Sequence, residues 1–71
     1  MRMDKDTAKA LMDEYLALGA ATSRATEVAK RLTDQTEREA VLRSIGSIMN
    51  IVYVELMRPI IKQHPELDPD R

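Results

Sequence analysis

The chain has 71 residues, no cysteine, two tyrosines with no Phe or Trp, and 11 basic against 12 acidic side chains. The lack of cysteine excludes disulfides and thiolate metal sites. A formal net charge of −1 argues against non-specific nucleic-acid binding and against a polybasic membrane anchor. A domain this short buries little surface, and oligomerisation is a usual remedy. We therefore expect one small helical domain that assembles with another chain.

The first predicted helix covers about residues 4–32, a stretch without proline in which helix-forming residues dominate. Asp4 is a suitable N-cap, and Asp6 favours the positive end of the helix dipole. Two ladders with heptad spacing run through this helix and indicate a packed seam. One ladder is Ala8, Tyr15, Thr22 and Ala29, and the other is Leu11, Leu18, Ala25 and Leu32.

The middle of this helix is rich in small residues and contains Gly19. Glycine costs about 1 kcal/mol relative to alanine inside a helix. Either the helix continues and a neighbouring backbone comes close, or it breaks at Gly19 and Ser23 caps a new helix. The two ladders keep their phase across Gly19, which favours a continuous helix.

Residues 33–36 are predicted to reverse the chain. Two overlapping capping boxes, Asp34 with Glu37 and Thr36 with Glu39, would start a second helix. Lys30 and Arg31 suit the end of the first helix, because cations favour the negative end of the dipole. No glycine stands at the expected C-cap, so a single uninterrupted helix is the alternative to an antiparallel hairpin.

The second predicted helix covers about residues 36–61, and its last part is apolar around most of its circumference. Eleven of the seventeen residues 45–61 are apolar, and they cover an arc of about 240°. A helix with one neighbour needs a stripe only a little over about 100° wide. Pro59 should kink or end this helix, although Ile60 and Ile61 indicate one more packed turn. Residues 1–63 form the predicted domain, and 64–71 a flexible tail.

The excess apolar arc predicts that two hairpins dimerise into a four-helix bundle through their second helices. Asn50 interrupts the arc and either fixes the register of the interface or faces solvent. Glu55 lies at the edge of the arc, either in solvent or against a basic partner such as Arg58 or Arg24. The predicted dimer interface comprises Ile45, Ile48, Met49, Val52, Leu56 and Ile60.

No group of residues carries recognisable chemistry. His64 is the only histidine, and no Glu-x-x-His motif is present, so we expect no catalytic, metal or cofactor site. The serines are expected on helices far from His64, which argues against nucleophilic catalysis. A basic cluster near the turn is largely cancelled by neighbouring acids, which argues against nucleic-acid binding; it comprises Lys30, Arg31, Arg38 and Arg43.

The sequence therefore predicts a non-enzymatic interaction module, a small homodimeric adaptor or regulatory subunit. Its expected partner is a second copy of the chain or another protein. Two alternatives are a bundle that binds a small hydrophobic ligand, and one half of an antitoxin-like or chaperone-like heteromeric complex. The first ten residues lack the apolar core of a signal peptide. Because residues 45–61 contain polar side chains and are fewer than about 20, we expect no membrane span and a cytoplasmic protein.

Overall fold

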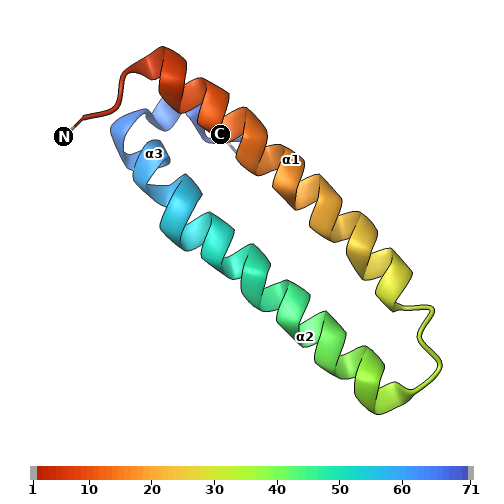
Figure 1. Cartoon of the computed structure of the whole chain (residues 1–71). Coiled ribbons are helices and arrows are strands. Elements are labelled where there is room, and N and C mark those ends of the chain that lie inside the picture. Colours follow the sequence, from red (N-terminus) through yellow and green to blue (C-terminus); the bar gives the residue numbers. More distant parts are fainter. Residues whose placement is uncertain (1, 71) are drawn as a thin grey trace.

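The computed structural model describes residues 2–70 and contains two long antiparallel helices joined by a short turn (Figure 1). Helix α1 spans Lys5–Ala29 and α2 spans Gln35–Ile51. The second rod continues without a gap through a π-helical segment, Val52–Met57, into α3, Arg58–Gln63. A 3-10 turn, Pro65–Leu67, follows. No strand occurs among residues 2–70, so the all-α hairpin is confirmed.

The helix starts follow the capping residues of the sequence. The Asp4 carboxylate accepts a hydrogen bond from the Thr7 amide at 2.9 Å, and Asp34 accepts one from the Glu37 amide at 3.2 Å. Helix α1 runs through Gly19 without a break. The turn is closed by the Arg38 guanidinium, which donates to the Leu32 carbonyl at 3.0 Å. This contact pairs a carbonyl of the loop, three residues after the end of α1.

The two long helices face each other through small residues. The Thr22 hydroxyl donates to the Met49 sulfur, and Gly19 lies beside the same methionine, whose methyl carbon would be 4.0 Å from an added Cβ. The inward-facing residues of α1 recur at alternating spacings of three and four, and they are Ala8, Met12, Tyr15, Gly19, Thr22, Thr26 and Ala29. On the opposite rod they are Arg38, Leu42, Ile45, Met49 and Val52.

Only one of the two predicted α1 ladders faces α2. The ladder of Ala8 and Tyr15 does so, whereas Leu18 and Ala25 of the second ladder are exposed. Met12, Gly19 and Thr26, each one residue later, take the inward positions. Small inward side chains let the helices approach closely, and they leave the larger leucine outside.

The buried core lies at the open end of the hairpin, away from the turn. It consists of Ala8 and Met12 from α1 with Val52, Met57 and Ile60 from the other rod. Ala29, near the turn, is the other buried apolar residue among those described. Helix α2 itself contains no buried residue. The middle of the hairpin is therefore thinly packed.

A π-helical segment shifts the helix face just before Pro59. The Arg58 amide donates to the carbonyl of Tyr53, five residues earlier. Proline has no amide hydrogen and crowds the carbonyl four residues before it, and a π turn is one way to accommodate this. The rod therefore continues to Gln63 instead of ending at Pro59. The wider turn places Met57, not Leu56, in the core after Val52.

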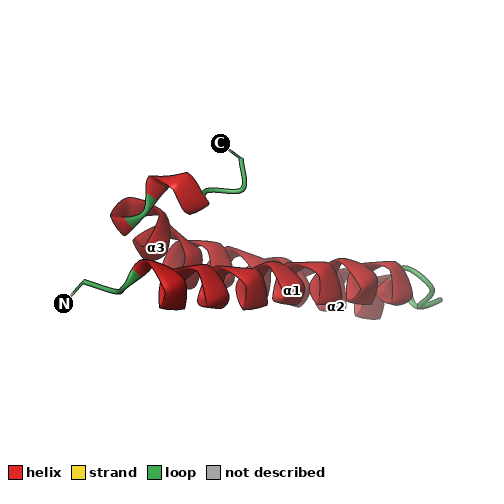
Figure 2. Ribbon diagram, turned by 90° about the horizontal axis from the view of Figure 1, so that it is seen from above, coloured by secondary structure: helices red, strands yellow, loops and turns green. Residues whose placement is uncertain are grey.

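Residues 63–67 make contacts that the sequence does not predict for a flexible tail. The Gln63 side-chain oxygen accepts a hydrogen bond from the Met3 amide at 2.7 Å, and the His64 Nε2 donates to the Met3 carbonyl at 2.8 Å. Lys5 pairs with Glu66 at 3.5 Å, and Leu67 packs against the core. Figure 2 shows this segment on one side of the plane of the two long helices.

The π register predicts unequal effects of two neighbouring truncations. Met57→Ala should lower the free energy of unfolding by about 2–4 kcal/mol, because it leaves a cavity in the core. Leu56→Ala should cost less than about 1 kcal/mol, since Leu56 is 37% exposed and Met57 only 9%. Urea denaturation at one fixed protein concentration measures both. An uninterrupted α-helix would give the reverse order.

Candidate interaction surface

One side of the hairpin carries a nearly continuous apolar surface over both helices. The residue directly before each inward-facing residue lies on this side. Two antiparallel helices are related by a two-fold axis normal to the plane that contains them. A step of one residue toward the N-terminus therefore leads to the same side of this plane on both helices. Nine of these residues form what we call the Leu18 face: Leu11, Leu18, Ala21, Ala25 and Val28 of α1 and Val41, Ser44, Ile48 and Ile51 of α2. The same rule places Thr7, Glu14 and Glu37 on this side, so Glu14 interrupts the apolar residues between Leu11 and Leu18, and Glu37 lies at the turn end.

The C-terminal segment lies on the opposite side. The ion pair between Lys5 and Glu66 marks the side of α1 that the segment covers. At about 100° per residue, Leu18 lies about 140° around α1 from Lys5. The segment is also confined to one end of the hairpin, and only one side of the helical plane carries it (Figure 2). The Leu18 face is therefore left uncovered by the described part of the chain.

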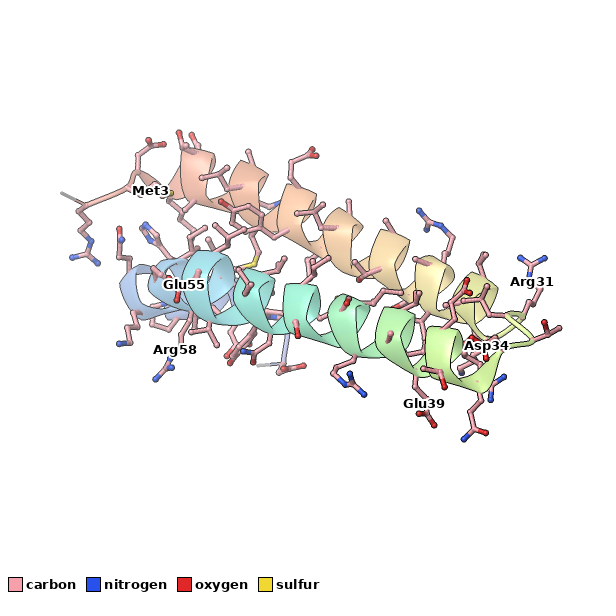
Figure 3. All side chains as sticks on the ribbon, turned by 60° about the horizontal axis from the view of Figure 1, so that its bottom comes forward. Met3, Arg31, Asp34, Glu39, Glu55 and Arg58 are labelled. Carbon is pink, nitrogen blue, oxygen red and sulfur yellow. The ribbon has the colours of Figure 1, made fainter. Side chains whose placement is uncertain are left out.

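The opposite side, which we call the tail face, is mostly polar. It contains the residues that directly follow the inward-facing ones: Lys9, Asp13, Leu16, Ala20, Ser23, Glu27 and Lys30 of α1, and Glu39, Arg43, Gly46, Asn50 and Tyr53 of the second rod. Figure 3 shows Glu39 and Arg58 extending from the same edge of the second rod, whereas Glu55 points to another side. The charged residues in the middle of the hairpin thus lie mainly on the tail face, which also carries the exposed Leu16 and Tyr53.

Leu18, Val28, Ile48 and Ile51 of the Leu18 face are substantially exposed, whereas Leu11 and Val41 are partly buried and Leu11 packs against the core. The exposed fraction is 46% for Leu18, 52% for Ile48 and 55% for Ile51. Single exposed apolar residues are ordinary on a soluble protein, but a contiguous patch along two helices marks a site of interaction. The Leu18 face is the candidate functional surface of this molecule.

The structure distributes the predicted interface residues over several places. Ile48 belongs to the Leu18 face, and Ile45 faces α1 and is partly buried. Met49 and Leu56 are 39% and 37% exposed. Val52 and Ile60 are buried in the core of the same chain. The predicted interface does not include Leu18, Val28 and Ile51, which are exposed. In the sequence, these residues can be found as the apolar residues that directly precede a small or inward-facing residue.

Two polar residues singled out in the sequence lie away from the Leu18 face. Asn50 directly follows Met49 and is exposed on the tail face. His64 is bound to the N-terminal segment through Met3, with its second ring nitrogen 3.6 Å from Glu66. Glu55 is exposed and lies in the π segment. Among the described residues, Glu55 forms no ion pair, whereas His64 lies beside Glu66.

Other possible sites are weaker. An open pocket is lined by Val54, Arg58, Pro59 and Lys62 on the outside of the second rod. Within residues 2–70, no group of three or more His, Asp or Glu side chains is arranged to hold a metal ion. The pocket is shallow and lies outside the space between the helices, where a ligand-binding bundle would enclose its ligand.

The rod Gln35–Gln63 is long and apolar enough to cross a membrane by length and composition, with a mean hydropathy of 1.4 in its most apolar window. Core helices of soluble proteins pass the same test. Only 6% of that window is buried inside the molecule, which again shows how little of this rod its own chain covers. Glu55 and Arg58, which lie in the apolar part of this rod, would each cost about 3 kcal/mol at the centre of a bilayer.

Comparisons with protein-family models, with curated proteins and with solved structures find no match for this chain.

Hydrogen bonds and ion pairs at the open end lower the pKa of two carboxylates. The pKa of Asp4 lies below its ordinary value of 3.8, chiefly because the Thr7 amide donates to the carboxylate. The pKa of Glu66 lies below 4.5, first because its own backbone amide donates to it and then because Lys5 and His64 are near. Both groups favour the folded chain when they are ionised.

These shifts predict a loss of stability in acid. Each carboxylate has a lower pKa in the folded than in the unfolded chain, so its contribution is complete above the unfolded value and is lost as pH falls through the folded value. The free energy of unfolding should decrease between about pH 5 and pH 2. The double variant Asp4→Asn, Glu66→Gln should show a shallower decrease in urea titrations, since Asn still caps α1. An unchanged slope would contradict this role for the two groups.

Proposed function

We propose that this protein is a non-enzymatic interaction module that acts as a homodimer, an adaptor or regulatory subunit whose two hairpins form a four-helix bundle. The single observation that carries the proposal is the exposure of the Leu18 face on a helix pair whose second member, α2, buries no residue. In proteins most helical stability comes from tertiary packing of an apolar face. A 17-residue helix without buried side chains gains little from its own chain, and a partner would supply the missing burial.

The distribution of exposed residues supports a homodimer over a heteromeric complex. Leu18, Val28, Ile48 and Ile51 lie exposed on one side of the hairpin, whereas the other side is mostly polar and carries the exposed Leu16 and Tyr53. Two such hairpins, packed through their apolar sides, leave polar surfaces outward on both, which is the arrangement of a soluble four-helix bundle. No further apolar element is needed to complete such a bundle.

A pair of matched substitutions on α1 tests the proposal. Leu18 and Leu16 are the same residue type, two positions apart, with exposed fractions of 46% and 44%. They lie on opposite sides of the hairpin. Leu18→Asp should raise the dimer dissociation constant at least about 100-fold, because a buried unpaired charge costs several kcal/mol. Leu16→Asp should leave it unchanged. Sedimentation equilibrium over a concentration series measures both, and circular dichroism reports helix content.

The outcomes separate the possible partners. A wild-type chain that is monomeric and helical at 100 μM, on the order of a hundred times the micromolar range expected for such a dimer, would overturn the homodimer. A chain that becomes helical only with another protein would replace it with the heteromeric complex. Equal effects of the two substitutions would show that the Leu18 face is not the contact.

A further inference from the structure

The Leu18 face extends from Leu11 to Val28 of α1, about 26 Å along the hairpin at 1.5 Å per residue, and it includes residues of both long helices. The hairpin is 46 Å long, so a second hairpin covers the face from end to end.

The charge of this side argues against two other occupants. Of the residues directly before the inward-facing ones, Glu14 and Glu37 are charged, both are acidic, and none is basic. An anionic membrane attracts helices with basic residues beside the apolar stripe, and a nucleic acid requires basic side chains. The apolar residues of the Leu18 face are complementary to those of a second copy.

The Leu18 face is self-complementary in shape. A large residue on one helix lies beside a small residue on the other at the same position along the hairpin axis, which we call its height. The Thr22–Met49 contact fixes the relative height of the two helices. Around that contact, α2 presents Ile48 and Ile51, whereas α1 presents Ala21 and Ala25. One turn nearer to the loop the order is reversed, because Val28 of α1 stands beside Ser44 of α2.

This pattern distinguishes the two symmetric ways of stacking two hairpins face to face. When both turns lie at the same end, α1 of one copy lies against α2 of its partner at unchanged height. Ile48 and Ile51 then meet the two alanines, and Val28 meets Ser44. When the turns lie at opposite ends, α1 lies against α1 and α2 against α2 with their heights reversed. With the two-fold axis at the height of the Thr22–Met49 contact, isoleucine then meets isoleucine and alanine meets alanine. The first arrangement fills space evenly, as close-packed interiors require.

We propose that two copies pack through their Leu18 faces with both turns at the same end of the bundle, α1 of each against α2 of the other. The two-fold axis then runs parallel to the helices, and the interface is isologous. The C-terminal segments lie on the outer sides, where they do not meet. This inference rests on the proposed homodimer and specifies its geometry.

Spin labels on single cysteines test the arrangement, since the chain has no cysteine of its own. Thr36 near the turn and Thr7 near the open end are both exposed. In separate Thr36→Cys and Thr7→Cys proteins, same-end packing predicts distances between the two labels of a dimer below about 30 Å, because helices in a bundle are 8–10 Å apart. Mixing the two labelled proteins should give an additional distance near the hairpin length of 46 Å.

Each outcome has one meaning. Long distances within both labelled proteins, with a short distance between Thr36 and Thr7 labels in the mixture, would overturn same-end packing and leave the homodimer standing. Absence of any distance between chains, with a monomeric mass by sedimentation, would overturn the homodimer as well. Binding of that monomer to neutral phosphatidylcholine vesicles would identify a membrane surface as the occupant instead. Leu18→Asp in the labelled proteins should abolish the short distances, whereas Leu16→Asp should leave them unchanged.

Discussion

The contact between the two long helices depends on small side chains, and the rest of the molecule follows from this. Gly19, Thr22 and Thr26 occupy the inward positions in the middle of α1. The two threonine hydroxyls donate to the carbonyls of Gly19 and Thr22 in their own helix, at 2.9 and 3.0 Å, so they are satisfied without a partner. Such residues allow close approach but bury little apolar area, and hydrophobic stabilisation scales with that area. The larger residues therefore remain outside.

Contacts at the two ends of the hairpin fix the relative position of the long helices, whereas its middle has few such contacts. At the open end, the core around Met12 and Ile60 is joined by the contacts of Met3 with Gln63 and His64. At the turn, the Asp34 cap and the Arg38 contact fix the start of α2. A surface between two anchored ends is ordered before it meets a partner, which reduces the conformational entropy lost on binding.

The helices, their capping residues and the turn can be predicted from the sequence, because each depends on local chemistry. Asp4 and Asp34 are examples. The helix faces cannot be predicted in the same way. Leu11, Leu18 and Ala25 have the same heptad period as Met12, Gly19 and Thr26, and hydrophobicity alone favours the leucines, whereas close packing selects the smaller set. Likewise Leu56 and Met57 are both apolar, and only the π turn before Pro59 decides between them. The contacts of His64 and Leu67 join segments about sixty residues apart, which no local pattern encodes.

The position of the C-terminal segment is consistent with the proposed bundle for a steric reason. Pro59 and the π segment turn the rod so that the segment after Gln63 passes over the tail face, where Glu66 pairs with Lys5. Had the helix continued in its earlier phase, a different set of side chains would face α1 from residue 56 onward, and Met57 and Ile60 would leave the core. The same shift that buries Met57 therefore keeps the segment away from Leu18 and Ile48. Closure of the hairpin at its open end and access to its apolar side are two consequences of one change in helix register.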